Sequence, residues 1–236
     1  MADEKKERAE LPQATFGDYA HAGIKGLISA VPIAGGLAAE IFGTVIAPPL
    51  SRRKDEWLEQ LADALVVLRD QGKIDFDELS KNEEFLSAVL EASSSAIRTH
   101  REEKRSALRN AVLNVATNRH NGEDEAALFL NYIDSLTAGH LRVLKYFQNP
   151  TGAYRLAGKE PFFPSIGGTP GDALTRLMPE FNNSEVLRRI VSDLFTRGLI
   201  NADTALIHTM VTGASVFANR TTRHGDAFLT FIDKPA

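Results

Sequence analysis

The chain has 236 residues, 43% of them hydrophobic and 25% charged, which is the ordinary composition of a globular protein with its own core. Its formal net charge is −4, so no overall positive field attracts nucleic acid or anionic lipid, and such binding needs a local patch. The lack of cysteine excludes disulfides, thiolate metal sites and cysteine nucleophiles, and it favours a cytoplasmic location.

The first residues, MADEKKERAELPQ, mix acidic and basic side chains and lack the basic-then-apolar order of a signal peptide. We expect residues 1–16 to form a flexible leader, as chain termini with few apolar residues usually do.

The next segment is unusually apolar. Residues 24–50 carry only two charges, Lys25 and Glu40. Prolines and paired glycines interrupt this segment and favour two short helices, over 17–30 and 34–46, that form a hairpin. The residues that define the hairpin are Ile28, Pro32, Gly35, Gly36, Glu40 and Phe42.

Two interpretations of the apolar hairpin stay open. The favoured one is burial inside a helical bundle, because amphipathic helices that follow in the chain can cover it. The other is conditional insertion into a membrane, with the basic residues 52–54 at the headgroups; each helix alone is too short to span a bilayer.

Helical periodicity continues after the hairpin. The Pro48-Pro49 pair favours a helix start, and apolar residues then recur every three or four positions over 53–70. A short helical turn is expected at 76–79. Asn82 is a predicted N-cap for apolar residues spaced helically over 85–97 and again over 108–115, as one long helix or as two separated by a kink.

The polar segment 117–122 ends in glycine and is the predicted domain boundary. Residues 17–120 are therefore expected to form a helical bundle containing the apolar hairpin, and residues 123–236 a second domain. The elements predicted for this domain are helices over 123–135, 138–147, 173–178 and 184–197, followed by two strands within 204–232.

This order of helices followed by a small β-hairpin wing is typical of a winged helix-turn-helix. The fold class we predict is therefore mainly α: an N-terminal helical bundle followed by a winged-helix-like module. The helix over 184–197 would be its recognition helix. The candidate contacts to a nucleic acid or another partner are Asn183, Arg188, Arg189, Arg220 and Arg223.

The same module would serve equally as a protein-interaction or packing unit. The near-zero local charge favours this second interpretation, because nonspecific affinity for DNA is built from phosphate neutralisation.

No enzyme signature is present in the sequence. The six histidines lack metal-ligand spacing, and the glycine pairs at 35–36 and 167–168 lack the strand–glycine–helix context of a phosphate-binding loop. We therefore expect no catalytic residues, no metal and no cofactor, and we interpret the glycine pairs as helix-packing or turn glycines.

Four short blocks, in this order, resemble the bacterial abortive-infection alpha family. The first runs from VPIAGG at 31–36 through AEI at 39–41 to the arginines at 52–53, and the others are LTAGHLRVL at 136–144, LFTRGLI at 194–200 and TRHGDAF at 222–228. The resemblance implies a role in defence against phage, in which infected cells die or stop growing. It supplies neither a molecular mechanism nor catalytic residues.

Together these observations predict a non-enzymatic bacterial defence protein that acts through a protein partner or self-association. In this hypothesis the protein is cytoplasmic and becomes membrane-associated only if the apolar hairpin is exposed on activation. The alternative is a transcription regulator that binds DNA through its winged helix.

Overall fold

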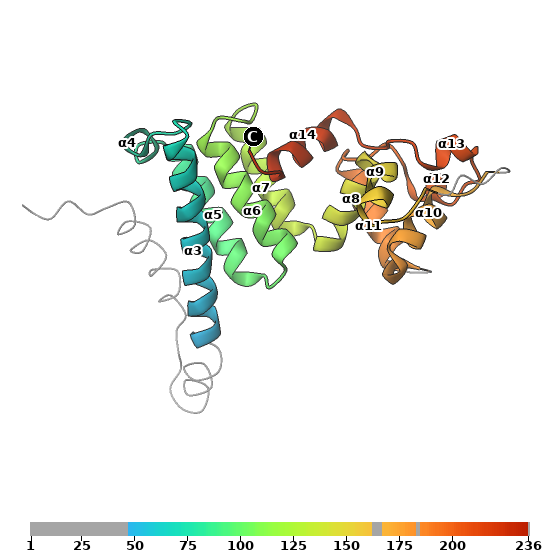
Figure 1. Cartoon of the computed structure of the whole chain (residues 1–236), viewed down its shortest axis with the longest axis horizontal. Helices are drawn as coiled ribbons and strands as arrows, with labels where there is room; N and C mark the ends of the chain where they lie inside the picture. The colour runs from blue at the N-terminus through green and yellow to red at the C-terminus, as the bar shows by residue number, and fades with distance from the viewer. Residues whose placement is uncertain (1–46, 162–166, 183–184, 236) are drawn as a thin grey trace, which may run out of the picture. The chain divides into compact units, whose positions relative to one another are not determined.

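The structure is a computed structural model that describes residues 47–161, 167–182 and 185–235 (Figure 1). The predicted leader at 1–16, the apolar hairpin at 17–46 and the candidate contact Asn183 lie outside the described residues. By its internal contacts the chain divides into residues 1–52 and 53–236, and the predicted boundary at 117–122 falls within the second unit.

The described residues are mainly helical, which confirms the predicted class. The helices of the first part are α3 (Ala47–Asp70), α4 (Phe76–Leu79), α5 (Glu83–Arg98), α6 (Glu102–Ala116) and α7 (Glu123–Ser135). None of the described helices combines the length and the apolar composition needed to cross a bilayer.

A fully buried tryptophan ties α3 to α5. The predicted apolar positions of α3 are buried, and its Trp57 donates a hydrogen bond from Nε1 to Oγ of Ser93 at 2.9 Å. A tryptophan N–H that is removed from water needs such a partner. Ser93 therefore lies inside the bundle as a hydrogen-bond acceptor for the tryptophan.

The segment from 82 to 116 forms two helices. Asn82 caps α5 as predicted, with its Oδ1 accepting from the backbone N–H of Phe85 at 3.0 Å. The backbone turns extended at Thr99, and α6 begins at Glu102. Of the two arrangements that the apolar period allowed, the protein adopts the broken one, and α5, α6 and α7 pack against one another.

The second part contains α8 (Ala138–Gln148), α9 (Pro150–Leu156), α10 (Pro170–Leu177), the 3-10 turn η2 (Pro179–Phe181) and α11 (Glu185–Thr196). It continues with α12 (Thr204–Ile207), α13 (Gly213–Val216) and α14 (Arg223–Ile232). The predicted helices over 138–147, 173–178 and 184–197 correspond to α8, α10 and α11.

The two strands predicted within 204–232 are wrong, because α12, α13 and α14 occupy this stretch. Thr222 caps α14 by accepting a hydrogen bond from the N–H of Gly225 at 3.0 Å. The apolar residues at 228–232 suit a helix spacing as well as a strand, and a short apolar run does not distinguish the two. Within the described residues, β pairing is limited to two isolated bridges, Gly168–Val211 and Ile200–Thr221.

The last helix, α14, packs against α6 and α8, so it joins the first and second parts of the unit. Its first turn approaches the backbone ahead of it so closely that a Cβ on Gly225 would overlap the carbonyl of Leu199. Only glycine fits this position without a shift of the backbone.

Candidate functional site

The helices α10 and α11 follow one another in the second part of the chain, with the 3-10 turn η2 after α10. Thr169 caps α10 by accepting a hydrogen bond from the N–H of Asp172 at 3.0 Å. In α11 the positions Leu187, Ile190, Val191 and Leu194 are buried, and the helix contacts α8 and α12. This spacing leaves the opposite side of α11 for solvent.

The predicted contact residues fall on separate segments. Arg188 and Arg189 are exposed on α11, and Arg223 is exposed at the first position of α14. The guanidinium of Arg188 forms an ion pair with the carboxylate of Glu185, with Nη1 and Oε2 3.3 Å apart. An exposed pair of this kind contributes little stability.

Arg220 is buried, with only 8% of its surface exposed. Its Nη2 donates to the carbonyl of Ser215 at 2.7 Å, and its backbone N–H donates to the carbonyl of Phe147 at 2.9 Å. Burial lowers the pKa of the guanidinium. A role for Arg220 in contacting nucleic acid does not fit this position, because the side chain is enclosed by protein.

A buried histidine connects α8 to α11. The ring of His140 completes the cap of α8 with Nδ1 2.8 Å from Oγ1 of Thr137, while Nε2 lies 3.4 Å from Oδ2 of Asp193 on α11. Burial lowers the pKa of His140, and the nearby Asp193 carboxylate opposes this shift. No local sequence pattern predicts this pair, because the two residues are 53 positions apart.

The exposed side of α11 is electrically balanced and partly apolar. The helix carries two acidic residues, Glu185 and Asp193, and two basic residues, Arg188 and Arg189. Its large apolar side chains at the edges of the exposed side are Val186, 60% exposed, and Phe195, 46% exposed.

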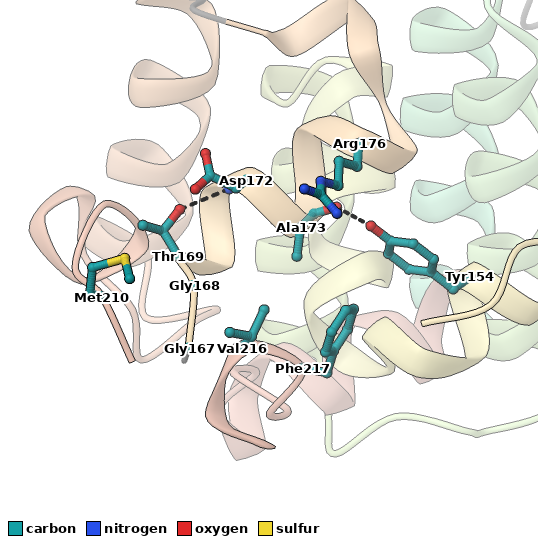
Figure 2. A pocket seen from close by; sticks show the side chains of 10 residues that line it. All are labelled: Tyr154, Gly167, Gly168, Thr169, Asp172, Ala173, Arg176, Met210, Val216 and Phe217. Atoms are coloured by element: carbon teal, nitrogen blue, oxygen red, sulfur yellow. Dashed lines mark hydrogen bonds between the residues drawn. The ribbon is translucent and has the colours of Figure 1, made fainter. Parts of the chain in front are cut away.

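A pocket of about 260 Å³ lies between α9, α10 and α13 (Figure 2). Tyr154 and Phe217 meet edge to face in its wall, with their ring centroids 5.4 Å apart and their planes at 83°. The Tyr154 hydroxyl donates to the carbonyl of Ala173 at 2.6 Å, which fixes the ring against α10. The other lining residues are Gly167, Gly168, Thr169, Asp172, Arg176, Met210 and Val216.

Backbone pairing shapes one edge of this pocket. Gly168 and Val211 exchange two backbone hydrogen bonds of 3.0 and 2.9 Å. Gly167 has φ of +103°, and a Cβ there would overlap the carbonyl of Val211. Gly167 therefore has a left-handed backbone, and Gly168 lies in the isolated bridge to Val211.

A second pocket, of about 320 Å³, lies on the other side of α10. Asp172 lines both pockets, and Arg188 and His208 line the second one. The short helix α10 therefore contributes to both pockets, and the second pocket also includes residues of α11.

No sequence motif predicts the first pocket, because its lining comes from three segments between 154 and 217. Within the described residues, no group of three or more histidine, aspartate or glutamate side chains is arranged to hold a metal ion.

Comparison with known proteins yields no match to a family model, to a curated protein or to a solved structure.

Proposed function

We propose that this chain is a non-enzymatic protein of bacterial anti-phage defence that binds a partner protein through the exposed side of α11. The defence role is supported by the four sequence blocks that resemble the abortive-infection alpha family. The last two of these blocks cover the end of α11 and the start of α14.

The observation that carries the choice of a protein partner is the composition of α11. Two acidic and two basic residues cancel, whereas affinity for a nucleic acid grows with the number of phosphates that lysine and arginine neutralise. Exposed Val186 and Phe195 give the same helix apolar area that a protein partner can bury. Aromatic and arginine side chains are also the residues that most often dominate binding at protein interfaces.

The proposal also assigns the role of latent effector to the predicted apolar hairpin. In this proposal, binding of a partner would lead the apolar hairpin predicted over 17–46 to act at the membrane.

A DNA-binding regulator is the second candidate, and the exposed arginines Arg188 and Arg189 on α11 favour it, because guanidinium groups neutralise phosphates. This candidate predicts a salt-dependent shift of promoter DNA that Arg188→Ala/Arg189→Ala abolishes.

Phage plating on bacteria that express the chain tests the proposed function. We expect wild type to lower the efficiency of plating, and Val186→Glu/Phe195→Glu to restore it, because a carboxylate in the contact area opposes burial there. Leu156→Glu is the matched control, since Leu156 is 93% exposed on α9 and lies outside α11.

The control variant should protect as well as wild type, and all three chains should accumulate to the same level with the same helical content. Full protection by Val186→Glu/Phe195→Glu would show that the exposed side of α11 is not needed for protection. Absence of protection by wild type against a broad phage panel would contradict the proposed role in defence.

A further inference from the structure

We propose that the pocket between α9, α10 and α13 is a binding site for a free apolar α-amino acid. This site is separate from the partner surface of α11, and its test does not depend on the proposed function.

The wall of the pocket suits an apolar side chain. Tyr154 and Phe217 present aromatic surface in a fixed edge-to-face pair, and Met210 and Val216 extend the apolar lining (Figure 2). Because Tyr154 already donates its hydroxyl hydrogen to Ala173, its ring serves as a wall. The volume of about 260 Å³ is below that of sites for drug-sized ligands, which limits the occupant to a small metabolite.

Two opposite charges border this apolar space. Asp172 and Arg176 both line the pocket from α10 (Figure 2). They are four residues apart, and this spacing brings side chains to the same face of a helix. A carboxylate is the natural partner for an ammonium group and a guanidinium for a carboxylate, so the pair matches the two charges of an α-amino acid.

A buried cation is bound to the backbone beside Val216, although it does not itself line the pocket. The Nη2 of Arg220 is bound to the carbonyl of Ser215, the residue before Val216. Among the described residues, no carboxylate forms an ion pair with Arg220, and its Nε is buried without a hydrogen-bond partner. A guanidinium that is removed from water and lacks a counter-charge makes its surroundings more favourable for an anionic group.

The hydroxyl of Tyr146, like the Nε of Arg220, is a buried polar group without a hydrogen-bond partner among the described residues. Tyr146 lies close enough to Arg220 for the two groups to interact electrostatically. Buried polar atoms of this kind are few in native proteins.

Isothermal titration of the full chain with three related probes tests the site. L-phenylalanine carries both charges, 3-phenylpropionate lacks the ammonium group, and 2-phenylethylamine lacks the carboxylate. We expect saturable binding of L-phenylalanine and at least about tenfold weaker binding of each analogue, since a charged hydrogen bond contributes about 1.5–3 kcal/mol.

Charge-removing variants assign each end of the ligand. Arg176→Gln should weaken L-phenylalanine at least about tenfold and leave 2-phenylethylamine unchanged, whereas Asp172→Asn should weaken L-phenylalanine and leave 3-phenylpropionate unchanged. Arg155→Gln, an exposed change on α9 that does not line the pocket, is the matched control and should bind like wild type. Far-ultraviolet circular dichroism and the melting temperature verify that each variant is folded.

Three results would overturn the proposal: no heat of binding for any probe at millimolar concentration, equal affinities for the three probes, or L-phenylalanine affinity that neither variant changes. Each of them leaves the partner surface of α11 untouched, because phage plating with substitutions on α11 tests that surface separately.

Discussion

Asn114 illustrates how a single polar residue joins distant parts of this chain. It is 2% exposed on α6, and its Nδ2 donates to the carbonyls of Phe231 and Asp233 at 2.8 and 2.9 Å. Asn110, one turn earlier, donates to the carbonyl of Ile232 at 2.9 Å. The last carbonyls of a helix have no partner within it, so the two amides satisfy the end of α14.

Asn114→Ala should lower the free energy of unfolding by about 1–3 kcal/mol, because it leaves carbonyls in a buried place without donors. Urea denaturation followed by circular dichroism measures this change. Asn110→Ala is the control: it removes one bond at a half-buried position and should cost about 1 kcal/mol or less. Equal effects of the two variants would contradict the role assigned to Asn114.

Residue identities predicted local caps well and distant contacts poorly. Asn82 caps α5 as expected, because a cap depends on the next three residues alone. Asn114 bonds residues more than a hundred positions away, and Arg220 is enclosed by segments distant in sequence. No local pattern distinguishes an arginine of this kind from one that contacts a partner.

At the scale of elements, the contact between α8 and α11 depends on a neutral histidine. His140 lies between these helices with Asp193, and Arg197 and Lys104 are the other charged groups that influence it. Because burial is the largest effect, the pKa of His140 in the folded chain lies below its ordinary value of 6.5.

This lowered pKa predicts a loss of stability in acid. Above about pH 6.5 both states hold the histidine neutral, and its contribution to stability is complete. As the pH falls below that value the unfolded chain takes up the proton first, so folding becomes less favourable until the folded pKa is passed. The urea concentration at which wild type is half unfolded should therefore decrease as the pH is lowered from about 7.5 to about 5.5.

His140→Gln is expected to show a shallower fall of the urea midpoint over the same range, since glutamine does not titrate. The comparison of slopes separates His140 from other acid-sensitive groups, which both proteins share. Parallel pH profiles would show that His140 does not contribute to the acid sensitivity.

Elements with a long apolar period could be predicted from the sequence, and short ones could not. The helix α3 buries apolar residues that recur every three or four positions, namely Trp57, Leu61, Leu65 and Leu68. The helix α7 has the predicted bounds. In contrast, α14 was mistaken for a strand, because Phe228, Leu229 and Phe231 alone fit both periods. Packing against α6 and α8 decides in favour of the helix.

At the scale of the whole molecule, residues 53–236 form one compact unit in which α14 returns to the helices of the first part. The winged-helix order predicted from the sequence assigned the recognition helix to residues 184–197, which include α11. It did not reveal the pocket, because α9, α10 and α13 meet only in the folded chain. We propose that the exposed side of α11 meets a partner protein.

Site-specific photo-crosslinking in phage-infected cells tests this claim most directly. A photoreactive phenylalanine analogue replaces Phe195 on α11 in one chain and Leu156 on α9 in another, and the crosslinked proteins are separated by mass and identified. The account predicts one discrete crosslinked partner from position 195 during infection and none from position 156. Identical crosslinking patterns from the two positions, or no adduct from position 195, would contradict it.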